Sequence, residues 1–188
     1  MKYLVFLLIS FTLGCSALVG IHSPKRADLS NIKKLESDYQ VQNSFICEKP
    51  YYDQIKTLKD SALKQRHAQP LQALYYNNKG QNVVTIVNCN VPGGINLKWN
   101  FNNILSAFPP NFTQYKDSVT LPFILNACNI DPKSIAYQDY DYTVLLFWNQ
   151  YMGRQTKHFL KEFEDNISKS KAYKVLKIYI NNDNLFVE

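Results

Sequence analysis

The chain has 188 residues, of which 46% are hydrophobic, and it carries a formal net charge of +6 at pH 7. This length suits one domain with a short extension rather than several large domains. The charge excess is spread along the chain without a run of five like charges, so the composition does not favour a nucleic-acid-binding protein.

The N-terminus has the pattern of a secretory signal. Lys2 precedes the apolar run Tyr3–Leu13, and small residues follow at Gly14-Cys15-Ser16. A short positive region, an apolar core and small residues at the cleavage point are typical of such signals. We therefore expect export from the cytoplasm.

The end of this signal resembles a bacterial lipobox. It reads Phe11-Thr12-Leu13-Gly14-Cys15, with Thr12 where lipoproteins usually have Leu. The resemblance implies a signal peptide over residues 1–14, acylation of Cys15 with palmitate-type chains, and a tether over residues 15–28 before a domain at 29–188. The lipid would hold the protein on a membrane of the cell envelope, on its periplasmic or surface side.

Two alternatives to lipidation stay open. Cys15-Ser16-Ala17 is a small-residue triplet that suits ordinary cleavage after Ala17. Apolar character also continues to Ile21, so the first residues reach the lower edge of the roughly 17–25 residues that a membrane helix needs.

Three further cysteines are Cys47, Cys89 and Cys128. With Cys15 lipidated they allow at most one internal disulfide and one free thiol, and an oxidising compartment favours the pair. The sequence leaves all three pairings open. The cysteines form no Cys-x-x-Cys and no metal-ligand spacing, so we expect neither a metal nor a cofactor.

The first elements of the domain are weakly marked. Ser30 suits the N-cap of a short helix, Val41–Cys47 alternates loosely as in a strand, and apolar residues at near-helical spacing predict a helix over Tyr51–Gln65. Pro70 follows that helix.

A hairpin is the clearest element of the middle region. Two apolar runs, Leu71–Tyr76 and Val83–Cys89, flank the turn residues Asn77-Asn78-Lys79-Gly80, in which Gly80 suits a positive φ. Further on, the pattern predicts helices over Leu97–Phe108 and Leu121–Asn129, the second capped by Thr120.

The last third reads as strand, helix, strand. Tyr142–Trp148 is continuously apolar, as in a central strand covered on both faces, and an apolar stripe predicts an amphipathic helix over Thr156–Ile167. Lys174–Asn181 then alternates. These elements predict a parallel β-α-β unit.

The junction of this unit resembles the active-site turn of thioredoxins. Thioredoxins carry Trp-Cys-Gly-Pro-Cys there, and this chain carries Tyr151-Met152-Gly153-Arg154-Gln155. Met152 and Gln155 occupy the two sulfur positions. Because thiol–disulfide exchange needs an attacking thiolate and a resolving thiol, this turn cannot perform it.

The order of the pieces differs from that of a thioredoxin. The helix and proline-led hairpin that should follow the β-α-β unit stand before it, as Tyr51–Gln65 and the hairpin after Pro70. We therefore expect an α/β, thioredoxin-like three-layer sandwich that is circularly permuted, with the hairpin half first. Pro70 would then be the counterpart of the family's cis-proline beside the turn. An unrelated α/β sandwich is the alternative.

Thioredoxin-like proteins bind extended peptide beside this turn and proline, so the resemblance implies noncatalytic binding of a protein or peptide. The candidate residues are Tyr151, Met152, Gly153, Arg154, Gln155 and Pro70. The chain also resembles small bacterial lipoproteins of uncharacterised function with a Phe-Trp…Gly-Arg element, here Phe147-Trp148 and Gly153-Arg154. Two alternatives are an envelope thiol–disulfide oxidoreductase using the cysteines outside the turn, and a purely structural lipoprotein.

Overall fold

The computed structural model describes residues 20–94, 96–112 and 117–187. The predicted signal peptide and Cys15 lie outside these residues. The helices and strands, in chain order, are α3 (Ile32–Tyr39), β1 (Phe45–Ile46), α4 (Pro50–Lys56), α5 (Ser61–His67), β2 (Gln72–Asn77), β3 (Asn82–Val87), α6 (Leu121–Ala127), β4 (Tyr142–Trp148), α7 (Arg154–Ile167) and β5 (Val175–Asn181). Short 3₁₀ turns are η1 (Asn88–Asn90), η2 (Phe101–Asn103), η3 (Pro132–Ser134), η4 (Tyr137–Asp139) and η5 (Asp183–Leu185).

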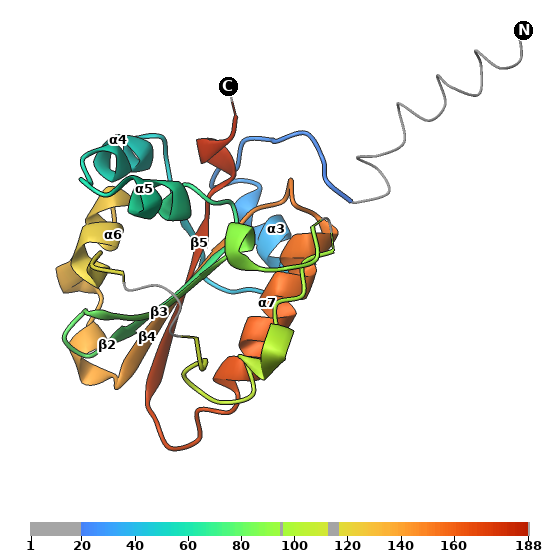
Figure 1. The fold of residues 1–188 in the computed structure, drawn as a ribbon. Coiled ribbons are helices and arrows are strands. Elements are labelled where there is room, and N and C mark those ends of the chain that lie inside the picture. The colour runs from blue at the N-terminus through green and yellow to red at the C-terminus, as the bar shows by residue number, and fades with distance from the viewer. Residues whose placement is uncertain (1–19, 95, 113–116, 188) are drawn as a thin grey trace, which may run out of the picture.

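Within the described residues the strands form one five-stranded sheet in the order β1-β5-β4-β2-β3. Strands β1, β5 and β4 are parallel, β2 pairs antiparallel with β4, and β3 pairs antiparallel with β2. The central position of β4 agrees with its continuously apolar sequence, because a strand with neighbours on both edges and helices on both faces is buried throughout. Figure 1 shows the sheet in the middle of the domain.

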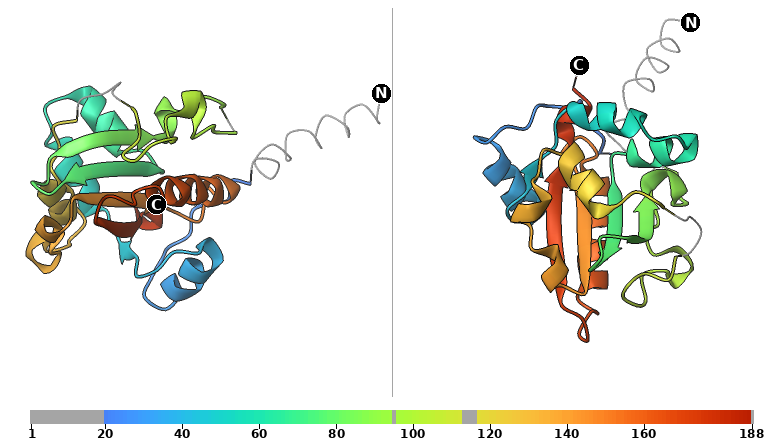
Figure 2. Two further views of the ribbon diagram at one scale, coloured as in Figure 1. Left: turned by 90° about the horizontal axis from the view of Figure 1, so that it is seen from below. Right: turned by 90° about the vertical axis from the view of Figure 1, so that its left-hand side faces the viewer.

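Helices cover both faces of the sheet, which gives three layers (Figures 1 and 2). Side chains alternate along β4, so Val144 and Leu146 join the core under α3 and α7, while Leu145 and Phe147 join the core under α4, α5 and α6. The predicted α/β class is confirmed, and so is the parallel β4–α7–β5 unit.

Helix α7 has the expected buried stripe and begins two residues earlier than its sequence pattern indicated. Phe159, Leu160, Phe163 and Ile167 are all buried. The hairpin and the helix after Thr120 also form where they were expected. Gly80 has φ +71°, and the Thr120 hydroxyl accepts a hydrogen bond from the Phe123 N–H (3.4 Å).

The single helix predicted over residues 51–65 is wrong, because the chain folds it as α4 and α5. Asp60 has extended backbone angles, and its carboxylate accepts hydrogen bonds from the Ala62 and Leu63 N–H groups, at 2.7 and 3.3 Å. Such a cap starts a new helix and so ends the periodic pattern before it.

The helix predicted over residues 97–108 is also wrong, since only η2 forms there. Asn102 and Asn103 have φ values of +51° and +58°, which a right-handed helix does not contain. The apolar spacing instead serves packing: Trp99 is fully buried, and its ring lies 4.8 Å from that of Phe159.

Near the N-terminus, the strand predicted over residues 41–47 shortens to β1. Asn43, just before it, has φ +52°, which interrupts an extended conformation. Asn31, rather than Ser30, is the N-cap residue of α3, and Asp28 accepts hydrogen bonds from the N–H groups of both.

Candidate functional site

The predicted site lies on the turn that joins β4 to α7. Gly153 has φ +48° and ψ −113°, a conformation that a residue with a Cβ rarely adopts. Asn149, the first residue after β4, holds the turn: its Oδ1 accepts a hydrogen bond from the Met152 N–H (3.0 Å), and its carbonyl accepts one from the Thr156 hydroxyl (2.7 Å). The turn is therefore fixed by a buried amide at the end of the strand.

The five turn residues differ in exposure. Gly153 and Gln155 are buried, Tyr151 and Met152 are half-buried, and Arg154 is exposed at the first position of α7. The Tyr151 ring packs 5.0 Å from the ring of Phe186. Within the pentapeptide, Tyr151, Met152 and Arg154 thus contribute the accessible surface.

Pro70 lies beside this turn. Its carbonyl accepts hydrogen bonds from the side-chain amides of Asn149 (2.9 Å) and Asn182 (3.0 Å), which follow β4 and β5. Its own peptide bond is trans: in the described residues the cis peptide bond is Phe108–Pro109. In this respect Pro70 differs from the cis-proline of thioredoxins.

A buried polar cluster at the carboxyl ends of β4 and β5 hydrogen-bonds to the backbone of the turn. The Asp183 carboxylate accepts hydrogen bonds from the Gln150 N–H (2.9 and 3.0 Å) and from the Asn181 amide (2.9 Å). Burial raises the pKa of Asp183 above its usual value, although these hydrogen bonds act in the opposite direction. The cluster holds the backbone of the turn in place.

Sequence reasoning missed this cluster. A signal for it was present, because four amide or carboxylate residues follow one another from the last residue of β5 onward, at Asn181-Asn182-Asp183-Asn184. In a parallel unit the ends of β4 and β5 lie at the same edge of the sheet, which is where α/β proteins place their sites.

The N-terminal segment Gly20–Asp28, predicted as part of a tether, lies across the turn. The His22 N–H donates to the Tyr151 carbonyl (2.7 Å), and the Gln150 side-chain amide donates to the Lys25 carbonyl (3.0 Å). Further along, the backbone of Ala27 makes two hydrogen bonds with the Asn184 side chain, both 2.8 Å.

The approach is closest at Gly153. A Cβ placed there would lie 2.0 Å from the Gly20 carbonyl oxygen and 3.1 Å from the His22 ring. The absence of a side chain at Gly153 therefore allows the segment to reach the turn.

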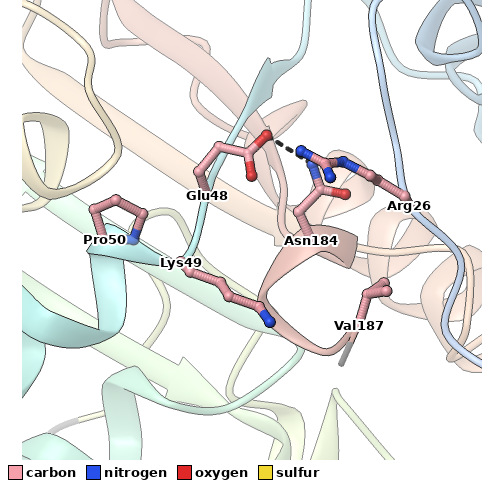
Figure 3. A pocket seen from close by; sticks show the side chains of 6 residues that line it. All are labelled: Arg26, Glu48, Lys49, Pro50, Asn184 and Val187. Atoms are coloured by element: carbon pink, nitrogen blue, oxygen red, sulfur yellow. Dashed lines mark hydrogen bonds between the residues drawn. The ribbon is translucent and has the colours of Figure 1, made fainter.

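Figure 3 shows a pocket next to this segment, between the start of α4 and the C-terminal end of the chain. Its volume is about 230 Å³, and its lining comprises Arg26, Glu48, Lys49, Pro50, Asn184 and Val187. The Glu48 carboxylate accepts a hydrogen bond from the Asn184 amide (2.8 Å). Ligand pockets for small molecules are usually larger, at roughly 300–1,000 Å³, so this pocket does not indicate such a ligand.

The three described cysteines are free thiols, and none is part of the turn. Cys47 and Cys128 are buried with their sulfur atoms 2.7 Å apart, whereas Cys89 is exposed on η1. Burial raises the pKa of Cys89, and burial together with contact to Cys47 raises that of Cys128 well above its usual value. Neither shift activates a thiolate at neutral pH.

A second buried polar group lies away from the turn. His67 Nε2 is 3.0 Å from Asp117 Oδ2, which also accepts a hydrogen bond from the Thr85 hydroxyl (2.9 Å). Both side chains of the His–Asp pair are inaccessible to solvent, so they act in packing rather than on a ligand from outside.

The described residues contain neither a metal-binding cluster nor a membrane-spanning helix. Residues 20–94, 96–112 and 117–187 contain no group of three or more His, Cys, Asp or Glu side chains arranged to hold a metal ion. None of the helices in that part of the chain combines the length and apolar character that crossing a membrane requires.

Comparisons with known proteins returned no match to a family model, to a curated protein or to a solved structure.

Proposed function

We propose that this chain is a noncatalytic binding domain for an extended protein segment or peptide, held at the cell envelope by a lipid on Cys15. The proposed face comprises Tyr151, Met152 and Arg154 of the turn, together with Pro70. The observation that carries this proposal is the position of the chain's own segment 20–28. It lies against this face through a backbone hydrogen bond from the His22 N–H to the Tyr151 carbonyl (2.7 Å) and a bond from the Gln150 side chain to the Lys25 carbonyl (3.0 Å), so the face accommodates polypeptide.

The fold behind the proposal is a circularly permuted thioredoxin-like domain. Supporting it, the β-α-β unit and the proline-led hairpin pair into one sheet through β4 and β2. Further support comes from the two points that an unpermuted chain would join, the end of β5 and the start of α4. The Cys47 N–H, three residues before α4, donates to the carbonyl of Asn181, the last residue of β5 (2.8 Å). Because these points are neighbours in space, moving the chain break there leaves the packing unchanged.

The chemistry of the turn favours binding over catalysis. Met152 carries a thioether and Gln155 an amide, and neither group can act as the attacking thiolate. Backbone hydrogen bonds and flat aromatic surface are what extended-peptide recognition uses, and Tyr151 supplies both, through its carbonyl and its half-buried ring.

Selection from a peptide phage library on the immobilised protein tests the binding face directly. We expect enriched peptides that lose binding to a Tyr151→Ala, Arg154→Ala double variant and retain it on a Lys56→Ala variant, changed on the exposed surface of α4. Enrichment that is equal on all three proteins would place the binding face elsewhere, and unchanged native partners for the double variant would favour a structural lipoprotein.

The membrane attachment has a separate test. We expect Cys15→Ser to release the protein from the membrane fraction, and mass spectrometry of the wild-type N-terminal peptide to show the acyl chains. An unmodified Cys15 would contradict the lipoprotein proposal and leave the binding face untouched. The oxidoreductase alternative makes a different prediction. The purified protein should reduce a model disulfide, and Cys89→Ser should abolish that activity.

A further inference from the structure

Two cysteines from distant parts of the chain meet in the core between the sheet and helices α4 and α6. Cys47 and Cys128 are 81 positions apart in the sequence, and their Sγ atoms are 2.7 Å apart. Their exposed fractions are 0% and 3%. A thiol is a weak hydrogen-bond donor, so a hydrogen bond alone does not draw two sulfur atoms this close together.

Regular structure fixes the backbone on both sides of this contact. The Cys47 N–H donates to the Asn181 carbonyl (2.8 Å), which ties the residue to the end of β5. Cys128 is the C-cap residue of α6, and its N–H donates to the carbonyls of Ile124 and Leu125 (3.0 and 3.1 Å). The approach of the sulfur atoms is therefore set by the fold and not by a flexible loop.

We propose that Cys47 and Cys128 form a structural disulfide when the chain folds in an oxidising compartment, and that Cys89 remains outside it. Of the three pairings that the sequence leaves open, the structure brings only these two sulfur atoms together among the described residues. Cys89 is on the exposed η1 turn, where its sulfur contacts the Asn90 side chain (3.3 Å).

The oxidant is a disulfide-bearing molecule, either a protein or glutathione disulfide. One cysteine thiolate attacks a sulfur atom of the oxidant and expels the first oxidant thiolate. The second cysteine thiolate then attacks the mixed disulfide and expels the other. The two cysteines together lose two protons and two electrons as the S–S bond forms, and the oxidant becomes two thiols. Because both cysteines are buried in the folded domain, the oxidant reaches them while the chain is still folding.

The same burial makes the bond a structural one. A reductant cannot reach either sulfur atom in the folded domain, and the raised pKa of Cys128 disfavours a thiolate there. The bond joins the β1–α4 junction to the end of α6 and encloses the β2–β3 hairpin. It lies on the face of the sheet opposite α7, so it is independent of the binding face proposed above.

Refolding the full chain in a buffer of reduced and oxidised glutathione, followed by alkylation and tryptic mapping, tests this pairing. Trypsin places the three cysteines in different peptides. Lys49 precedes a proline and is not cleaved, so the peptide that contains Cys47 extends to Lys56. Cys47 falls in residues 35–56, Cys89 in 80–98 and Cys128 in 117–133. The matched control is the same mixture kept in denaturant, where the fold does not select a pair.

We expect the refolded protein to yield the linked peptides 35–56 and 117–133 with Cys89 alkylated, and the denatured control to yield mixed pairings. Recovery of alkylated Cys47 and Cys128 from the refolded protein, or a crosslink to Cys89, would overturn the proposal.

Thermal denaturation gives a second readout. Refolding in reductant, which reaches the sulfur atoms only in the unfolded chain, should lower the Tm of a Cys89→Ser protein by roughly 10 °C relative to refolding with oxidised glutathione, because the bond closes a long loop in the unfolded chain. It should leave the Tm of a Cys47→Ala, Cys128→Ala protein unchanged. An equal response of the two proteins would also contradict the disulfide.

Discussion

The contact between the turn and the N-terminal segment can be broken by a single methyl group. In Gly153→Ala the new Cβ would lie 2.0 Å from the Gly20 carbonyl oxygen and 3.1 Å from the His22 ring. These distances are too short to be absorbed by small shifts, because the nearer atom belongs to the backbone. We expect the segment to leave the turn, and the hydrogen bond from His22 to Tyr151 to be lost.

Two effects set the expected loss of stability in Gly153→Ala. Alanine at φ +48° carries a backbone strain of roughly 1–2 kcal/mol. Loss of the backbone hydrogen bond and of the packing around it adds about 1–2 kcal/mol. We therefore expect Gly153→Ala to lower the free energy of unfolding by about 2–4 kcal/mol, which corresponds to a fall in Tm of roughly 5–15 °C.

Gly94→Ala is the matched control. Gly94 has φ +56°, and a Cβ there meets no described atom within 4 Å, so this change adds strain without a collision. The assay combines urea denaturation with limited trypsin digestion at Lys25 and Arg26, which lie in the segment. Only Gly153→Ala should accelerate cleavage at these two residues.

An equal loss of stability in both variants, with unchanged cleavage at Lys25 and Arg26, would refute the reasoning. The Gly20 carbonyl would then not lie against Gly153 in solution, and the segment would be free of the turn. In that event the main support for an extended-polypeptide face would also be lost.

Three further changes probe the core and the support of the turn. Burial alone would raise the pKa of Asp117, but its hydrogen bond with His67 and the charge of that residue lower it below the usual value. The stability that this carboxylate contributes is therefore present above its unfolded pKa of about 3.9. It is lost as pH falls through the lower folded pKa. Asp117→Asn should therefore reduce stability at pH 7 and flatten its decline in acid, as measured by urea denaturation across pH. Phe163→Ala should cost about 3–5 kcal/mol, because the ring is fully buried against Trp99 (5.6 Å), and an unchanged Tm would contradict this packing. Asn149→Asp keeps an acceptor for the turn but places a carboxylate oxygen against the Pro70 carbonyl. It should lower the free energy of unfolding by about 3 kcal/mol at pH 7 and by less in acid, where the carboxylate is protonated. Equal losses of stability at both pH values would argue against the hydrogen bond from Asn149 to Pro70.

The elements predicted most accurately are those in which local pattern and burial agree. The bounds of β4 match the sequence prediction at both ends, and those of β5 differ by one residue. In α7 the apolar stripe identified the buried face, but apolar spacing could not reveal that the first turn begins at Arg154. Periodicity reports which residues are buried, and it says little about where a helix starts.

The two incorrect helix predictions share a physical cause. Around Trp99 the apolar residues lie at helical intervals, yet they pack from an irregular segment because two consecutive asparagines adopt positive φ. Asparagine tolerates that conformation, and nothing in the spacing of its neighbours signals when it does so. Similarly, Asp60 interrupts one predicted helix through a side-chain cap, which is a local hydrogen bond that a count of apolar positions does not detect.

The proposed site was located from sequence by its turn, but its supporting contacts depend on the sheet. Asn149 and Asn182 both donate to the Pro70 carbonyl although they lie 79 and 112 positions from it in the chain. Long-range pairs of this kind follow only from the parallel register of β4 with β5 and from the pairing of β2 with β4. Resemblance at the turn predicted that Pro70 would be near; it did not predict which side chains would hold it.

The buried amides also bear on the binding role proposed for this turn. In a redox turn the reacting sulfur atoms must be accessible and must change partners during each cycle. Here the equivalent region is held by Asn149, Asn182 and Asp183, whose buried side chains hydrogen-bond to backbone that would otherwise be free to move. A satisfied buried network of this kind makes a surface rigid, because each displacement exposes an unpaired polar group. A rigid edge loses little conformational entropy when a polypeptide segment binds, and the chain's own residues 20–28 already lie against it.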